Sequence, residues 1–188
     1  MDWWLKSYLD RGRFELPERA GVVTMKGRPL TLVGEELKPG MPAPGFRVVD
    51  NELNEVTMDQ IKGEPMVITS VPSLDTPVCD IETRHFNRAA AEMGPKVKIY
   101  TISMDLPFAQ KRWCGANGVK NLQTLSDYRD AWFGYRYGIL IKELRLLARA
   151  VFVIDREGIA RYCEVVGEVA DEPDYDSALF ALRGLVGY

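Results

Sequence analysis

A short apolar segment followed by a long helical pattern constrains the fold of this chain more than any other feature. The segment Met66–Ser70 lies between two prolines and is typical of a buried strand. After it, residues 79–93 carry an apolar side at helical spacing, and a Gly-Pro pair ends the pattern. A buried strand that leads into an amphipathic helix is typical of an α/β domain, in which helices cover a sheet.

The rest of the chain continues this alternation and finishes with a hairpin and a helix. Strands are predicted at 22–26, 29–33, 46–49, 97–103, 122–125, 150–155 and 159–166, and helices at 108–114 and 174–185. This order predicts a three-layer α/β domain with a mixed central sheet and an N-terminal β-hairpin around Gly27-Arg28. We assign residues 21–188 to the domain and residues 1–20 to an N-terminal extension, in which a short helix is expected to dock on its own domain or on a neighbouring subunit.

Length and charge exclude several classes of function. A chain of 188 residues suits one well-buried domain. Its formal net charge of −3 gives no electrostatic reason to expect binding to nucleic acid or to an anionic membrane. No apolar stretch approaches the roughly 20 residues that a membrane-spanning helix needs. We therefore expect a soluble protein without a nucleic-acid or membrane partner.

The N-terminus and the cysteine count bear on the cellular compartment. Residues 1–20 are too charged for a secretory signal, so we expect a cytoplasmic protein. In that compartment disulfides are usually transient and chemical rather than structural. Three cysteines and one histidine, without C-x-x-C spacing, also argue against a zinc site.

The segment that joins the first strand to its helix places a thiol at the start of that helix. Thr76 is a good N-cap, and Pro77 suits the first helical position, so Cys79 occupies the third. A capping box carries a glutamate at that position, because backbone donors and the helix dipole favour negative charge there. The same interactions should favour the thiolate form of Cys79.

A favoured thiolate is too small an effect to explain an efficient reaction with an oxidant such as a peroxide. Full ionisation of a thiol that is about one-tenth ionised raises its rate only about tenfold. Further catalysis requires donors aimed at the oxygen atoms on which charge develops. The local candidates are the Cys79 N–H, the Thr76 hydroxyl and an arginine. On residue type alone, the four candidates for that arginine rank nearly equal: Arg84, Arg129, Arg145 and Arg149.

Several long motifs in this chain resemble one known family. They are VTMKGRPLTLVG (23–34), PSLDTPVCDIETRHFN (72–87), SMDLPFAQKRWCGANG (103–118), LSDYRD (125–130), LLARAVFVID (146–155) and EPDYDSALFAL (172–182). PSLDTPVC carries the Pro-x-x-x-Thr-x-x-Cys signature of the peroxiredoxins. With the other motifs, the chain resembles the bacterial thiol peroxidases, which are atypical two-cysteine peroxiredoxins with a thioredoxin-like fold. Residues 1–20 have no counterpart in this pattern.

The resemblance implies a role for each matching residue. Cys79 matches the peroxidatic cysteine, which becomes a sulfenic acid, and Cys114 matches the resolving cysteine, which forms a disulfide with it. Thr76 and Pro72 match the residues that shape the pocket, and Arg149 matches the arginine that holds the thiolate and the peroxide. The family implies a homodimer without metal or organic cofactor. It also implies hydrogen peroxide and organic hydroperoxides as substrates, with thioredoxin as the reductant.

The remaining candidate residues have simpler interpretations. Cys163 lies in a strand-like segment and is expected to be structural. His85 lies more than a helical turn beyond Cys79 and is expected to be a bystander. Phe108 and Trp113 are expected to pack beside Cys114. If Cys79 and Cys114 lie on separate helices, a disulfide between them requires local unwinding, because its Cα atoms must approach within about 7 Å.

Two other functions on the same fold are weighed against the peroxidase. A peroxide sensor, which passes oxidation to a partner protein, uses the same Cys79 site, although an internal resolving thiol favours turnover. A dithiol–disulfide oxidoreductase is disfavoured, because Glu82 stands three residues beyond Cys79 where a second cysteine would be expected.

Overall fold

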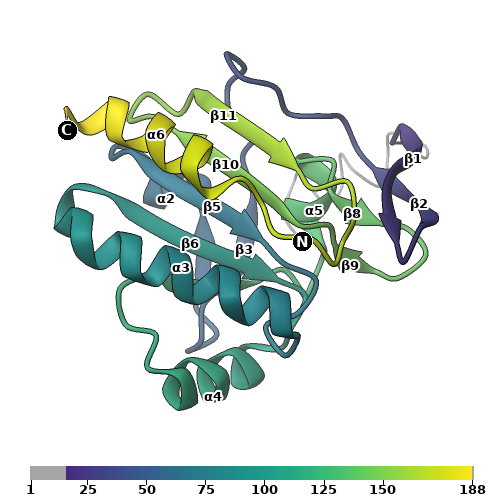
Figure 1. The fold of residues 1–188 in the computed structure, drawn as a ribbon, viewed down its shortest axis with the longest axis horizontal. Helices are drawn as coiled ribbons and strands as arrows, with labels where there is room; N and C mark the ends of the chain where they lie inside the picture. The colour runs from purple at the N-terminus through teal and green to yellow at the C-terminus, as the bar shows by residue number, and fades with distance from the viewer. Residues whose placement is uncertain (1–15, 188) are drawn as a thin grey trace, which may run out of the picture.

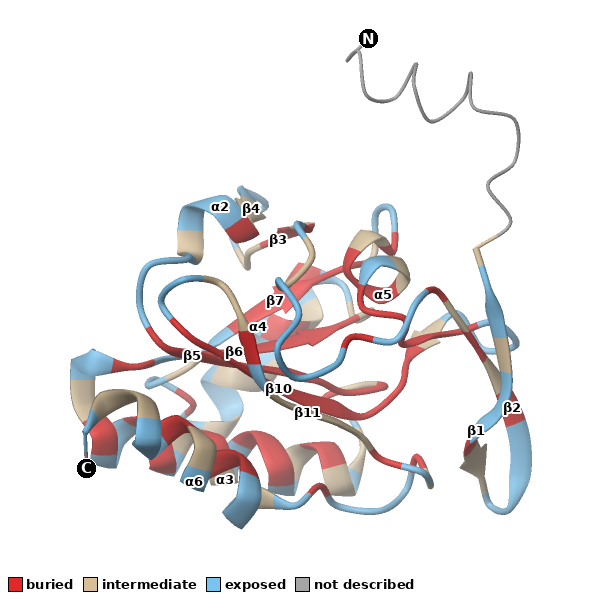
Figure 2. Cartoon of the chain, turned by 90° about the horizontal axis from the view of Figure 1, so that it is seen from above, coloured by how far each residue is buried: buried red, intermediate tan, exposed pale blue. Residues whose placement is uncertain are grey.

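The protein is an α/β domain of three layers, as a computed structural model that describes residues 16–187 shows (Figures 1 and 2). The central sheet has seven strands in the order β11-β10-β5-β6-β7-β3-β4. These are β3 (Arg47–Val49), β4 (Glu55–Thr57), β5 (Met66–Ser70), β6 (Lys98–Ser103), β7 (Gln123–Ser126), β10 (Ala150–Ile154) and β11 (Ala160–Val165). Strands β5, β6 and β7 are parallel, and the others join antiparallel, so the predicted mixed sheet is confirmed.

Helices cover both faces of this sheet. In Figure 2, α3 and α6 lie along one face, and α2 and α5 lie beyond the other. The helical elements are α2 (Met58–Ile61), α3 (Pro77–Met93), the 3₁₀ turn η1 (Gly94–Lys96), α4 (Pro107–Asn117), α5 (Trp132–Arg136) and α6 (Tyr175–Val186). Among residues 16–187, no helix is long and apolar enough to cross a membrane.

Strand alternation explains why the sheet is buried on both faces. On β5, Val67 packs into the cluster under α3 and α6, whereas Met66 and Ile68 pack into the cluster on the opposite face. On β10, Val151 and Phe152 divide between the two clusters in the same way. Apolar side chains therefore point to both faces, as expected of strands at the centre of a layered domain.

The N-terminal hairpin belongs to a second, smaller sheet beside the main one (Figure 1). Its order is β1-β2-β8-β9, with β1 (Glu18–Met25), β2 (Arg28–Val33), β8 (Leu140–Ile141) and β9 (Leu146–Leu147). The hairpin turns at Lys26-Gly27, one residue earlier than expected, and both residues have positive φ, 51° and 73°. Such angles characterise the two-residue turn that matches the twist of a hairpin.

Helix α3 begins and ends where the sequence signals predict. Thr76 is the N-cap, Pro77 is the first helical residue, and Gly94 follows the last residue with a φ of 66°. Its buried side includes Phe86 and Met93, which pack on the sheet. The strand β5 and this helix together fix the position of Cys79 at the edge of the core.

Several short elements were not expected from the sequence. They are β4, α2, α5, β8 and β9, each of five residues or fewer. Strand β1 starts at Glu18, inside the segment treated as an extension. The helix expected near the start of that extension lies outside the described residues.

Candidate active site

The Cys79 thiol lies at the third position of α3 and is fully buried. Its sulfur accepts hydrogen bonds from Thr76 Oγ1 at 2.8 Å and from Arg149 Nη2 at 3.3 Å. Two donors, one of them cationic, therefore converge on one buried sulfur. Hydrogen bonds in which one partner is ionised are stronger than those between neutral groups, so the Arg149 contact is a strong one.

The Thr76 hydroxyl has one hydrogen and two acceptors within reach. Besides the Cys79 sulfur, the carbonyl oxygen of Ser73 lies 3.1 Å from Thr76 Oγ1. A protonated thiol lets the hydroxyl donate to Ser73, whereas a thiolate draws that hydrogen to the sulfur. Thr76 makes no side-chain cap to the helix backbone. Its hydroxyl is therefore available to the reacting sulfur.

Arg149 lies immediately before β10 and reaches Cys79 from the strand side of the site. Its side chain is only 1% exposed. The guanidinium donates to Glu82 Oε2 and, through Nε and Nη2, to the Val169 carbonyl oxygen at 3.3 and 3.1 Å. Three acceptors, two on α3 and one in the loop after β11, thus fix one cation beside the sulfur, and its planar fork suits this arrangement.

The other three arginines that the sequence analysis weighed have different partners. Arg84 pairs with Asp80 at 2.9 Å and also contacts Asn117. Arg145 donates to the Tyr135 hydroxyl, and Arg129 lies over the ring of its neighbour Tyr128. Arg149 is the one of the four with a described contact to Cys79.

Glu82 is a site residue that was not predicted. Its position was considered only because a dithiol–disulfide oxidoreductase would have a second cysteine there. Its side chain is fully buried, and its Oε1 has no hydrogen-bond partner among the described residues. Burial raises the pKa of Glu82 to about 7, although the Arg149 cation opposes the shift. One guanidinium therefore serves two acidic groups, Glu82 and Cys79. The signal for this role is the spacing, because a residue three positions after Cys79 lies on the same helix side.

The loop before Cys79 is held by an acidic residue from the neighbouring strand. Pro72 is buried and lies two residues after the end of β5. Asp105, just after β6, accepts from Ser73 Oγ at 2.7 Å and from the Leu74 N–H at 2.8 Å. These bonds fix the segment that carries Thr76. Asp105 was not among the predicted site residues.

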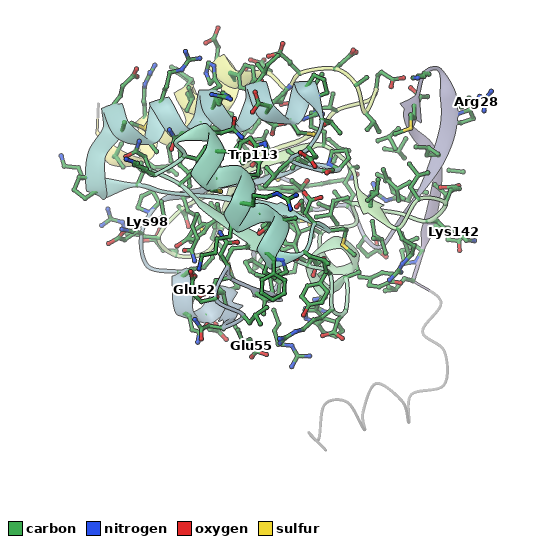
Figure 3. The ribbon with its side chains drawn as sticks, turned by 90° about the horizontal axis from the view of Figure 1, so that it is seen from below. Arg28, Glu52, Glu55, Lys98, Trp113 and Lys142 are labelled. Carbon is green, nitrogen blue, oxygen red and sulfur yellow. The ribbon has the colours of Figure 1, made fainter. Side chains whose placement is uncertain are left out.

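Cys114 lies on α4 and does not contact Cys79. All three cysteines are free thiols. Cys114 Sγ lies 3.4 Å from Thr124 Oγ1 on β7, and partial burial raises the pKa of its thiol. Its neighbour Trp113 packs instead against the cluster that contains Cys79 (Figure 3).

A surface hollow separates α4 from the first turn of α3. It is lined by Leu74, Asp75, Thr76, Pro77, Asp80, Arg84, Arg112, Trp113, Ala116 and Asn117. The prediction that Phe108 packs beside Cys114 is wrong, because Phe108 is 65% exposed. It lies in the first turn of α4, whose buried residues are Pro107 and Gln110.

The two remaining predicted bystanders have contacts of their own. The His85 ring stacks on Tyr175 with a centroid distance of 4.0 Å. Cys163 packs partly buried against the sheet core, and burial raises the pKa of its thiol to about 12. Within residues 16–187, no three histidine, cysteine or acidic side chains are grouped so that they could hold a metal ion.

The chain is similar to proteins of one family. The family model described as Redoxin matches residues 38–179. A thiol peroxidase of Bacillus subtilis (strain 168) is 52% identical over 164 residues, which cover 87% of this chain and 98% of that protein. A thiol peroxidase of Staphylococcus haemolyticus (strain JCSC1435) is 50% identical over 163 residues, with coverage of 87% and 98%.

Solved structures are also similar to this chain. A peroxiredoxin-like protein from Aquifex aeolicus superposes with a TM-score of 0.82 at 45% identity, over 89% of this chain and 97% of that chain. A thiol peroxidase from Chromobacterium violaceum has a TM-score of 0.77 at 23% identity, over 86% and 95%, and shows the fold alone. With a buried thiol held by a hydroxyl and a guanidinium, this chain belongs to the redoxin family, among its thiol peroxidases, and is a thiol-dependent peroxidase.

Proposed function

We propose that Cys79 reduces hydrogen peroxide and organic hydroperoxides through a sulfenic acid. The Cys79 thiolate attacks the terminal oxygen of the hydroperoxide, so a sulfur–oxygen bond forms while the O–O bond breaks. The leaving oxygen departs with the electron pair and takes a proton from solvent, which yields water or an alcohol. The sulfur is oxidised by two electrons, and the peroxide is reduced by two.

The contacts around the sulfur support this step. Thr76 and Arg149 both donate toward Cys79 Sγ, at 2.8 and 3.3 Å. The same donors are placed to bind the oxygen that approaches the sulfur and the oxygen that leaves it. Donors fixed before the reaction stabilise developing charge without reorganisation, which is the largest effect in many active sites. This convergence on one buried sulfur is the observation that carries the proposal.

In the second step Cys114 resolves the sulfenic acid. The Cys114 thiolate attacks the Cys79 sulfur, an S–S bond forms, and the sulfur–oxygen bond breaks. Hydroxide leaves and takes a proton to become water. The thiols lie on separate helices, so the resolution step includes local unwinding of α4 and of the first turn of α3. A dithiol of thioredoxin then reduces the disulfide, and both thiols are restored.

We also propose that the enzyme is a cytoplasmic homodimer. The catalytic disulfide needs a reducing compartment to be recycled. The family resemblance and exposed apolar side chains at the start of α4 support the homodimer. Leu106 and Phe108, at the start of α4, are 53% and 65% exposed.

The mass of the protein after one equivalent of peroxide tests the two-cysteine chemistry. We expect the wild type to lose two hydrogens and to yield a cross-linked peptide that joins Cys79 and Cys114. Cys79→Ser should not react, and Cys114→Ser should gain one oxygen per chain and then stop. Normal turnover by Cys114→Ser with thioredoxin would show that Cys114 is not the resolving cysteine.

A coupled assay distinguishes a thioredoxin-dependent peroxidase from a peroxide sensor. Thioredoxin, its reductase and NADPH are supplied with peroxide, and NADPH consumption is followed. We expect many turnovers per enzyme, which Cys163→Ser should leave unchanged. A disulfide that forms but is not reduced by thioredoxin would contradict thioredoxin as reductant and favour the sensor.

A further inference from the structure

The orientation of Arg149 depends on one backbone carbonyl outside the catalytic helix. Two of its nitrogens, Nε and Nη2, donate to the Val169 oxygen at 3.3 and 3.1 Å. Nη2 is also the nitrogen that contacts the Cys79 sulfur. If the Val169 carbonyl turned away, the guanidinium would lose two of its four contacts. The peptide unit that carries this carbonyl therefore helps to set the position of the guanidinium.

The carboxylate of Glu168 holds that same peptide unit from its other end. The N–H of Ala170 belongs to the unit whose carbonyl is that of Val169, and it donates to Glu168 Oε1 at 3.3 Å. A peptide unit is planar, so fixing its N–H also fixes the direction of its carbonyl. An anion at the N–H end also polarises the carbonyl and strengthens the bonds that it accepts.

The Glu168 carboxylate is itself fixed by the tip of the N-terminal hairpin. It accepts from Thr24 Oγ1 at 2.8 Å, from the Lys26 N–H at 3.0 Å and from the Gly27 N–H at 3.1 Å. Bonds from Gly27, Thr24 and Lys26 lower the pKa of Glu168 to about 2, so it stays ionised near neutral pH.

Backbone hydrogen bonds reinforce the contact between the hairpin and the loop after β11. The Thr24 N–H donates to the Gly167 carbonyl at 2.7 Å, and the Val169 N–H donates to the Thr24 carbonyl at 2.9 Å. In Figure 1 this loop passes beside the hairpin, whose tip carries Arg28, labelled in Figure 3. The hairpin and the Arg149 site are therefore connected by a continuous series of hydrogen bonds.

We propose that Glu168 is a positioning residue for the peroxide reaction, which acts through the Val169–Ala170 peptide to hold Arg149 against Cys79. This inference rests on the proposed roles of Cys79 and Arg149. It assigns a function to the N-terminal hairpin, which supports the active site from a distance without touching the reacting atoms. Loss of the carboxylate should therefore lower the rate of the peroxide reaction.

The test compares two carboxylates that bind the same hairpin. Glu168→Gln keeps the size of the side chain but removes its charge. The matched control is Glu143→Gln, because Glu143 accepts from the Thr31 N–H on β2 at 3.1 and 3.0 Å and has no described contact with the loop after β11. In a single turnover of reduced protein with hydrogen peroxide, we expect Glu168→Gln to lower the rate constant about tenfold. We expect Glu143→Gln to match the wild type.

Two readouts distinguish positioning from general damage to the fold. In an Arg149→Met background, Glu168→Gln should have little further effect, because the two residues act in series. Thr24→Val, which removes one bond to the carboxylate and keeps the backbone pairing, should lower the rate in the same direction by less.

The inference is overturned if Glu168→Gln has the wild-type rate, or if its effect is equally large in the Arg149→Met background. Cys79→Ser is measured beside these variants. If Cys79→Ser still consumes peroxide, the proposed function itself fails. If Cys79→Ser is inactive and Glu168→Gln is unchanged, only the role of Glu168 fails. Should Glu168→Gln not fold, a wild-type rate for Thr24→Val counts against the inference.

Discussion

At the scale of single residues, the proposed chemistry depends on the shape of the Arg149 side chain as well as on its charge. The guanidinium contacts Cys79, Glu82 and the Val169 carbonyl at once, and an ammonium cannot reproduce this planar fork. We expect Arg149→Lys to lower the rate of peroxide reduction on the order of 100-fold. Stopped-flow measurement with the reduced enzyme checks this, with Arg145→Lys as the control. A loss below threefold would contradict the assignment.

The buried carboxyl of Glu82 predicts a specific pH dependence of stability. Its pKa is raised from 4.5 to about 7, so the folded protein keeps a proton in a range where the unfolded chain has lost it. Its contribution to stability is therefore full below about pH 4.5 and decreases as the pH rises through about 7. Glu82→Gln removes this titration, so the variant should gain stability relative to the wild type as the pH rises.

Denaturant unfolding of both proteins, reduced, at about pH 5 and about pH 8 measures this change. Burial also raises the pKa of Asp127 to about 7, but Asp127 is present in both proteins, so its effect cancels in the difference. A difference in unfolding free energy that stays constant over this range would contradict the raised pKa of Glu82.

The sequence located some residues of the site more readily than others, for physical reasons. Cys79 and Thr76 could be found because the capping signals of a helix are local in the chain. Arg149 needed the family pattern, since its 70-residue separation from Cys79 is bridged only in the fold. Glu82 resembled a surface residue of a helix. Glu168 was missed because most of its partners are backbone N–H groups, which leave no trace in the side-chain pattern, and its side-chain partner Thr24 lies 144 residues away in the chain.

At the scale of elements, we expect α4 to unfold locally more easily than the other long helices, α3 and α6. Its buried residues are Pro107 and Gln110, whereas α6 buries Ala178, Leu179 and Leu182. Gln110 anchors α4 through polar bonds, from Nε2 to Ser103 Oγ at 2.9 Å and to the Leu125 carbonyl at 2.8 Å. Few apolar contacts imply a low free energy of local unfolding.

Hydrogen exchange tests the expected unwinding. We expect the disulfide form to lose protection in α4 and in the first turn of α3, while α6 keeps the protection it has in the reduced protein. Cys114→Ser treated with one equivalent of peroxide is the control, because its sulfenic acid forms without a disulfide and α4 should stay protected. Unchanged protection of α4 in the wild-type disulfide form would refute local unwinding.

Elements were predictable to the extent that their signals were local. The strand β5 and the helix α3 were found with nearly the right ends, because prolines and a glycine mark them. The strands β8 and β9, of two residues each, and the five-residue α5 were not found. Such short segments have no periodicity to detect, and neighbours distant in the chain stabilise them.

At the scale of the whole molecule, the hairpin sheet is fixed to the main body at two places. At the base of the hairpin, Gly34 approaches α5 too closely to carry a side chain, since a Cβ on Gly34 would lie 2.1 Å from the Tyr135 carbonyl oxygen. Arg19 bridges this contact by donating to the carbonyls of Gly34 and Gly138. At its tip the hairpin binds Glu168. Because the hairpin is held at its base and at its tip, it can keep Glu168, and through it Arg149, in a fixed position.

The proposed homodimer also belongs to this scale. Isolated exposed apolar side chains are common, but Leu106 and Phe108 lie two residues apart at the start of α4, the helix whose later residues Arg112 and Trp113 line the hollow. Phe180 on α6 is 80% exposed and provides a comparison on another helix. If the dimer buries the first pair, a charge placed there should be costly, because it would have to be desolvated at the interface.

We therefore expect Phe108→Glu to convert the dimer to monomers at concentrations where the wild type is dimeric, and Phe180→Glu to leave it dimeric. Light scattering during size-exclusion chromatography gives the mass in each case. Dissociation by Phe180→Glu alone would place the interface at α6, and a monomeric wild type would refute the dimer.

Because α4 carries Cys114, an interface at Leu106 and Phe108 would cover the start of a helix that must unwind. Resolution of the sulfenic acid should then be faster in the monomeric Phe108→Glu variant, which the rate of disulfide formation after one equivalent of peroxide would reveal.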